Sequence, residues 1–169
     1  AVTLRVFDPD EGEESFESTI DAEGTFVFDD VMIHANRRYY VTVLFARGFF
    51  VSDIVRGDPA NPVLELPITV YERTDDPEAV TITLMLLQFE LGGEGLQVSH
   101  IVNVRNETDR LFLSEDVVTE YQQASLYITL PPDALNIEFS DPERFALTIQ
   151  DKTVVDTQPV FPEEVHPVH

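Results

Sequence analysis

A run of carboxylates near the start of the chain is the first group of residues whose types could do chemistry. Asp8-Pro9-Asp10-Glu11-Gly12-Glu13-Glu14 offers the hard oxygen ligands that calcium prefers. The ligand offsets do not fit an EF-hand loop, and no helices flank the run. The alternative is a solvated hairpin loop whose charges repel edge-to-edge pairing. We expect no metal site here and treat five carboxylates as candidate partner-binding residues: Asp8, Asp10, Glu11, Glu13 and Glu14.

Histidines are the second group. His166 and His169 lie three residues apart beside Glu163 and Glu164, which could bind a stray divalent metal. A proline-broken terminal tail lacks the surroundings that fix ligand geometry, so we expect a flexible tail instead. His100 alternates with apolar residues, which predicts a hydrogen-bonded packing residue on an inner face rather than a ligand.

Other residue types that support catalysis are missing. The chain has no cysteine, which excludes thiol nucleophiles, disulfides, Cys-ligated zinc, iron–sulfur clusters, covalent haem and blue copper. The sequence has no Gly-x-Ser-x-Gly elbow and no phosphate-cradling glycine loop. Among so many carboxylates, a pair at catalytic separation arises by chance. We therefore predict a protein that is not an enzyme and holds no cofactor.

Aromatic and arginine side chains gather around one predicted hairpin. About half of these aromatic residues must face inward as core, because side chains alternate along a strand. The others can form an exposed patch with the composition of a protein interface. The candidate partner-binding residues of this hairpin are Arg37, Arg38, Tyr39, Tyr40, Phe49 and Phe50.

The chain is strongly acidic, with 10 Lys and Arg against 32 Asp and Glu and a formal net charge of −22. A surface of this sign excludes nucleic acid as a partner. It steers basic partners towards the protein, although solubility alone is the simpler interpretation. No apolar run approaches the ~20 residues of a membrane-spanning helix, and no signal peptide is recognisable. We expect membrane attachment only through partners or flanking segments.

The elements that must position these residues are strands. Apolar and polar residues alternate with period two along most of the chain, as in Leu96–Val104. Phe16–Phe28 predicts a hairpin around the turn Asp21-Ala22-Glu23-Gly24. Strands separated by turn signals at intervals of about eight to twelve residues are typical of β-sandwiches. The predicted fold class is all-β, with two consecutive antiparallel β-sandwich domains.

The strongest break in the pattern is Gly57-Asp58-Pro59-Ala60-Asn61-Pro62, because two prolines and a glycine disfavour regular structure. Pro67 makes Val63–Glu72 an edge strand or a crossing between sheets. We predict one domain over residues 1–60 and a second over 61–169 with an extended C-terminal tail. The chain starts directly in a predicted strand and stops where another could begin, which indicates a mature or fragmentary chain.

The first third of the chain contains three segments in a characteristic order: Val2–Phe7, Ser18–Val31 and Tyr39–Val43. This strand, Asp-x-x-Gly-x-Phe turn and Tyr-x-Val-x-Val strand resemble a carboxypeptidase regulatory-like domain. The Val-Pro-like step of that family is Val31-Met32 here, so the usual proline is missing. The resemblance covers about residues 1–55 and implies a prealbumin-like (Ig/prealbumin-like) seven-stranded sandwich.

The second half of the chain contains Val70–Pro77, Leu96–Asn106 and Leu130–Ala134. These segments are similar to a bacterial extracytoplasmic sandwich that often follows a carboxypeptidase regulatory-like domain. That sandwich is fused to, or encoded beside, c-type cytochromes, notably in filamentous phototrophic bacteria. The resemblance transfers no catalytic residue. It implies a periplasmic or cell-surface location and an accessory role near electron-transfer proteins.

We therefore predict a non-catalytic accessory or scaffold subunit of a membrane-attached electron-transfer complex resembling alternative complex III. Its expected partners are protein subunits, c-type cytochromes among them, which it would brace while offering an acidic docking surface. The alternative is a structural subunit of a surface filament or adhesin that uses strand exchange. A carbohydrate-binding module is a third candidate, and the absence of Trp counts against it.

Overall fold

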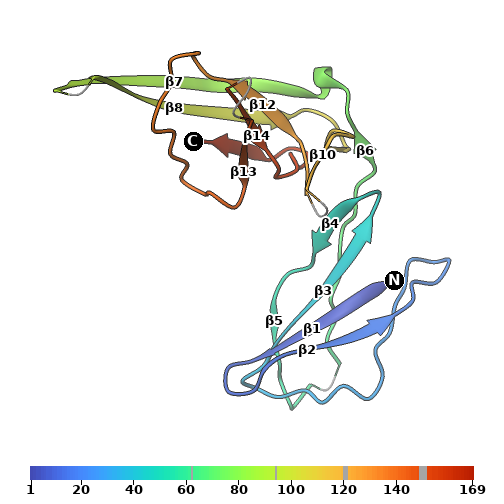
Figure 1. Ribbon diagram of the computed structural model, residues 1–169. Coiled ribbons are helices and arrows are strands. Elements are labelled where there is room, and N and C mark those ends of the chain that lie inside the picture. Colours follow the sequence, from blue (N-terminus) through green and yellow to red (C-terminus); the bar gives the residue numbers. More distant parts are fainter. Residues whose placement is uncertain (62, 94, 120–121, 149–151) are drawn as a thin grey trace. The chain divides into compact units, whose positions relative to one another are not determined.

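The computed structural model describes residues 1–169 except 62, 94, 120–121 and 149–151 (Figure 1). The fold is all-β, as predicted, and its sheets are antiparallel apart from one short parallel pair. The chain divides into two compact units, Ala1–Tyr71 and Glu72–His169. A 3-10 turn, η1 (Pro77–Ala79), lies at the start of the second unit. The described residues include no helix that is long and apolar enough to cross a bilayer.

The first unit is built on one antiparallel sheet. Its spatial order is β2-β1-β3-β4, and β5 also pairs with β3. Alternate residues of a strand share a face, so the odd apolar side chains of β3 lie beside the even ones of β1 and form a buried core with them. The strands are β1 (Val2–Asp8), β2 (Gly12–Ser18), β3 (Arg38–Phe45), β4 (Gly48–Val51) and β5 (Val55–Arg56).

Two extended segments outside the sheet cover this core, with the side chains Phe26, Phe28, Val31, Ile33, Leu64, Leu66 and Ile68. The predicted hairpin over Phe16–Phe28 is therefore wrong in part. The Asp21–Thr25 turn forms, with Gly24 at a φ of 83°. Phe16, however, belongs to β2 and pairs with Leu4 of β1. Residues 64–68 complete the core, and the first compact unit runs to Tyr71.

The second unit contains two three-stranded sheets and two short strand pairs. The sheet of order β15-β8-β7 comprises β7 (Val80–Gly92), β8 (Gly95–Asn106) and β15 (Val165–Val168). The sheet of order β12-β14-β13 comprises β12 (Leu126–Thr129), β13 (Phe145–Thr148) and β14 (Thr153–Asp156). The short pairs are β6 (Arg73–Thr74) with β9 (Leu111–Phe112), and β10 (Val117–Thr119) with β11 (Gln122–Gln123).

The two larger sheets of the second unit share one core. Val102 and Val104 of β8 are buried in the same cluster as Phe145 of β13, Val154 of β14 and Val168 of β15. The C-terminal residues are therefore not the extended, flexible tail that the sequence predicted. They form a strand that pairs with Val102–Arg105 of β8. Pro167 fits within this strand because β15 lies at a sheet edge, where a missing N–H is tolerated.

The β7–β8 hairpin projects beyond the other strands of its unit (Figure 1). β15 pairs with β8 only from Val102 to Arg105, so nearer the turn the described sheet consists of β7 and β8 alone. We call residues 84–91 and 96–101 the arm. A bulge at Thr83 lies at its base, between the pairs Ile82–Val104 and Leu84–Asn103. The Thr83 hydroxyl donates a hydrogen bond to the Asn103 carbonyl at 3.2 Å.

Candidate functional site

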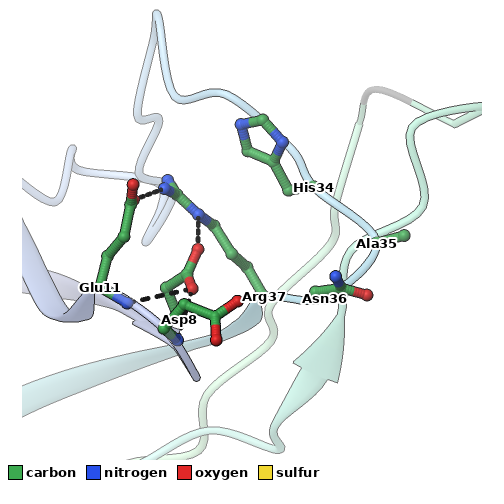
Figure 2. A pocket seen from close by; sticks show the side chains of 7 residues that line it. Asp8, Glu11, His34, Ala35, Asn36 and Arg37 are labelled. Atoms are coloured by element: carbon green, nitrogen blue, oxygen red, sulfur yellow. Dashed lines mark hydrogen bonds and ion pairs between the residues drawn. The ribbon is translucent and has the colours of Figure 1, made fainter.

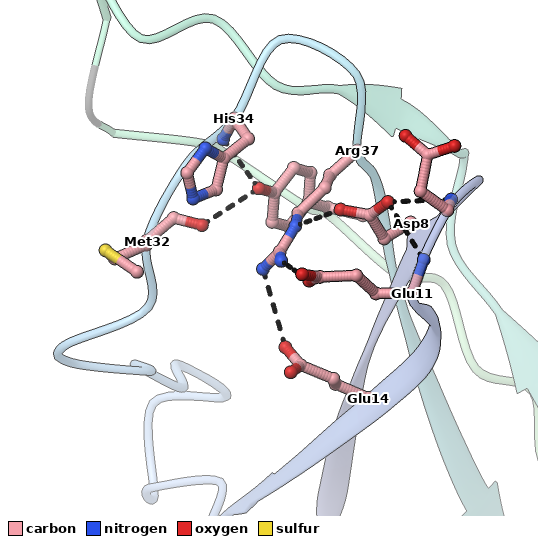
Figure 3. A network of polar contacts seen from close by, with 8 residues as sticks. Asp8, Glu11, Glu14, Met32, His34 and Arg37 are labelled. Carbon is pink, nitrogen blue, oxygen red and sulfur yellow. Dashed lines mark hydrogen bonds and ion pairs between the residues drawn. The ribbon is translucent and has the colours of Figure 1, made fainter.

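The acidic turn between β1 and β2 encloses a guanidinium group. Arg37, which precedes β3, donates from Nε to Asp8 at 2.7 Å and from Nη2 to Glu11 at 2.6 Å. A third contact joins Nη1 to Glu14 at 3.5 Å. Figure 2 shows the Arg37 side chain with Asp8 and Glu11, and Figure 3 shows it with Glu14 as well. A shallow hollow beside it is lined by Asp8, Asp10, Glu11, His34, Ala35, Asn36 and Arg37.

Hydrogen bonds favour the ionised form of Asp8. Its Oδ1 accepts from the backbone N–H of Asp10 at 2.9 Å and from that of Glu11 at 3.3 Å. The Asp10 N–H and then the Arg37 side chain hold the pKa of Asp8 below its ordinary value. The same Asp8 hydrogen bond raises the pKa of Arg37. Asp8 and Arg37 are therefore both charged at neutral pH and form an ion pair.

The five candidate carboxylates of this turn are partly neutralised within the molecule. Arg37 pairs with Asp8, Glu11 and Glu14, and Arg5 pairs with Glu13 at 3.0 Å. Two cations thus offset part of the field that the five carboxylates would direct at a basic partner. In the described residues, no group of three or more His, Asp or Glu side chains is arranged to hold a metal ion. The turn fits a solvated hairpin loop, and a docking role for it stays a prediction.

The aromatic hairpin is divided between core and surface. Tyr39 and Phe50 are only 1% and 2% exposed, so these two predicted partner residues are core residues instead. The Tyr39 hydroxyl donates to the Met32 carbonyl and accepts from the His34 N–H, both at 2.9 Å (Figure 3). Buried tyrosines need such partners for their polar end. Phe49 and Arg38 are exposed and Tyr40 is half-buried, so their partner role stays a prediction.

The second unit contains a buried cluster of ionisable side chains: Arg144, Asp156 and His166. Asp156 is fully buried, and Arg144 binds it bidentately, with Nε donating to Oδ1 at 2.8 Å and Nη2 to Oδ2. His166 of β15 places Nε2 2.8 Å from Oδ2. Burial alone would raise the pKa of Asp156, but the hydrogen bonds from Arg144 and His166 outweigh it and lower the pKa. The predicted tail histidine His166 is therefore a core residue.

The arm combines strand pairing with exposed apolar side chains. Met85 lies opposite Val102, Leu87 opposite His100, and further pairs continue to the turn. Directly opposite residues share a face of the ribbon. One face, which we call the apolar face, therefore carries Met85, Leu87, Phe89, Leu91, Leu96, Val98 and His100. Its six apolar side chains are 45–84% exposed.

The apolar face continues the core side of the sheet. Val102 follows His100 on that face of β8 and is buried against the β12-β14-β13 sheet. From His100 towards the turn, no described strand of the β12-β14-β13 sheet pairs with or covers the arm. The reverse face has Leu84, Leu86 and Ile101 near the base and polar residues towards the turn: Gln88, Glu90, Gln97 and Ser99. Such a ribbon can bind a protein surface through its apolar face or a further strand along β7.

The period-two pattern of Leu96–Val104 predicts a strand for one half of the arm, but no residue of the arm was among the predicted binding residues. The alternation of Leu96–Val104 predicted which side faces inward, and it is the side that faces the core at Val102. His100 lies on that side, but its buried Nε2 has no hydrogen-bond partner among the described atoms. The length of the two strands could have indicated the arm. β7 and β8 have 13 and 12 residues, whereas strands usually have about five or six.

Comparisons with protein-family models, with curated proteins and with solved structures find no match for this chain. The two family resemblances therefore stay predictions, and the exposed arm is the structural observation that bears most directly on function.

Proposed function

We propose that this chain is a non-catalytic accessory subunit of a larger protein assembly, which it joins through the arm. The observation that supports this is the apolar face with its six exposed side chains. At roughly 100 Å² each they form a patch of about 600 Å², the upper end for soluble monomers and a size that usually marks a functional surface. A protein that binds through this face would bury it.

The finer proposal concerns the domains and their place in the cell. The first unit is a prealbumin-like sandwich of carboxypeptidase regulatory-like type, and the second is an Ig-like sandwich. The protein lies outside the cytoplasmic membrane, in a membrane-attached electron-transfer complex resembling alternative complex III. The resemblances of Val2–Val43 and Leu96–Asn106 support this. The net charge of −22 supports docking of a basic mobile carrier, because aligned carboxylates steer cationic partners.

The test is purification of the tagged chain from native membranes in mild detergent, with the other chains identified by mass spectrometry and haem by absorption. Leu87→Glu places a charge on the apolar face, and Gln88→Glu places the same charge on the reverse face. We expect haem proteins to co-purify with the wild type and Gln88→Glu, and to be lost with Leu87→Glu. A wild-type chain that purifies without other chains would overturn the proposal.

The alternative function, a subunit of a surface filament, is favoured by a different observation. β7 is the edge strand of its sheet, with 13 residues whose outer backbone groups are available for strand addition. In that case the purified material would consist of polymers of this chain alone. Electron microscopy of the same preparation separates the two functions.

A further inference from the structure

The apolar face of the arm resembles one layer of a β-sandwich, and no described strand forms a second layer over it. In the body of the second unit, the same side of β8 packs on β12-β14-β13 through Val102 and Val104. Towards the turn the ribbon keeps its apolar alternation but lacks a second layer. A flat two-stranded surface with an apolar pleat is matched by another surface of the same kind, because aligned sheets interdigitate their side chains.

A protein surface suits the arm better than a lipid surface does. The outer edge of β7 presents backbone N–H and C=O groups, and hydrocarbon offers them no partners. A protein that packs on the apolar face leaves this edge in contact with water, which satisfies its backbone groups.

The arm nearly lacks charge, although the chain carries −22. Between Leu84 and Ile101, strand residues contribute one carboxylate, Glu90, near the turn and on the reverse face. Two arms that pack antiparallel place their turns at opposite ends, roughly 25 Å apart for a strand of this length. That separation exceeds the Debye length of about 8 Å, so the two Glu90 carboxylates scarcely interact.

We infer that the occupant of the apolar face is a second copy of this chain, whose arm packs antiparallel and face to face on the first. Two faces of about 600 Å² bury about 1,200 Å² together, the lower limit of specific interfaces. The dimer deepens the proposed function, on which it rests: the arms join two copies of this chain, and the pair rather than the single chain enters the larger assembly. Repulsion between the two acidic bodies opposes it, so added salt strengthens the dimer.

The first test is sedimentation equilibrium of the purified chain over a range of protein and salt concentrations. We expect a monomer–dimer equilibrium whose dissociation constant falls as salt rises. Leu87→Glu should raise that constant by about 100-fold, because it buries an unpaired charge in an apolar interface. Gln88→Glu adds the same charge on the reverse face and should change it by less than about threefold. A monomer at about 1 mM, or equal effects of both substitutions, would overturn the inference.

The second test uses the absence of native cysteine. Single cysteines at Leu87 and at Gln88 sit on opposite faces of the arm. Packed sheets lie about 10 Å apart, so a short bis-maleimide is the suitable cross-linker. We expect cross-linked dimers with Leu87→Cys and only monomers with Gln88→Cys. The reverse result would place the interface on the other face and overturn the inference.

Failure of the dimer and failure of the proposed function give different results. If the chain is monomeric but Leu87→Glu still loses the haem proteins in membranes, the inference is wrong and the accessory role stands. If the dimer forms but Leu87→Glu retains every other chain, the accessory role through the arm is wrong and the inference stands.

Discussion

The hairpins β1–β2 and β7–β8 are both antiparallel pairs with one apolar face, but only the first has that face covered. β1 is flanked by β2 and β3, and the segments 26–33 and 64–68 pack over its apolar residues. β7 is an edge strand, and the apolar side chains of the arm stay exposed. The first hairpin therefore contributes to the stability of its unit, whereas the second offers a surface.

The two hairpins also differ in charge: the first has many charged side chains, whereas the arm has almost none. The β1–β2 turn is rich in carboxylates, but Arg37 and Arg5 bind four of the five candidates. The arm has a single carboxylate among its described strand residues, Glu90, and its apolar side chains are exposed. Charge that is satisfied within the molecule is a weaker sign of a partner than apolar area that remains exposed.

The largest expected effect comes from the base of the arm, where β8 is held by β15. Asp156→Asn removes the carboxylate that binds Arg144 and His166, and leaves the Arg144 guanidinium without its ion pair. Breaking a buried pair from one side costs about 3–5 kcal/mol of unfolding free energy. The measurement is urea unfolding followed by NMR signals of β14, with β1 signals as the control. A loss below about 1 kcal/mol would show that the cluster adds little to the closure of this unit.

A matched pair of leucines tests the comparison between the hairpins directly. Leu4 of β1 is buried, so Leu4→Ala should lower the free energy of unfolding by about 2–5 kcal/mol. Leu91 of the arm is 84% exposed, so Leu91→Ala in dilute monomer should lower it by less than about 0.5 kcal/mol. Chemical denaturation of both variants gives the two values. Equal losses would mean that the arm is covered in the isolated chain, and the comparison would fail.

Acid should weaken the second unit through Asp156. Its pKa in the folded protein lies below its ordinary value, so the folded state binds fewer protons than the unfolded state between the two values. This stabilisation is complete above about pH 4 and is lost as the pH falls through the folded pKa. The difference in Tm between the wild type and Asp156→Asn should therefore shrink on acidification. A difference that is constant with pH would contradict the lowered pKa.

The smallest effect is expected in the acidic turn. Arg37→Gln removes a hydrogen bond that lowers the pKa of Asp8, so this pKa should rise towards its ordinary value. It should not reach that value, because the Asp10 N–H still donates to Asp8. NMR titration of the Asp8 carboxyl measures the shift, and Arg5→Gln is the control because Arg5 pairs with Glu13 instead. An unchanged Asp8 pKa in Arg37→Gln would show that the turn is not held by this arginine.

Period-two patterning was enough to predict the all-β class and which side of β8 faces inward. It could not show where the second layer ends, because alternation is the same for a covered strand and for an exposed one. Phe26 and Phe28 show the opposite limit, since they fill the first core from a segment outside the sheet. Local pattern reports which side is apolar, whereas cover depends on residues far away in sequence.

The errors at Tyr39 and His166 have a related cause. Tyr39 shares the core face of β3 with Val41 and Val43, but composition alone made it an interface residue. Pro167 made residues 165–168 look like a tail, but a proline is tolerated there because β15 pairs with β8 on one side only. The hydrogen-bonding contact between His166 and Asp156 joins two residues of one buried cluster that no spacing rule connects.

The bulge at Thr83 decides which side of the arm is apolar. Were Thr83 paired in the ladder, Leu84 would lie opposite Val102, and every later residue of β7 would turn to the other side. Met85 and Leu87 would then lie on the opposite face from the apolar residues of β8, and the ribbon would carry exposed apolar side chains on both faces. The bulge, by leaving this one residue out of the ladder, thus separates a one-sided ribbon from a ribbon with apolar side chains on both faces.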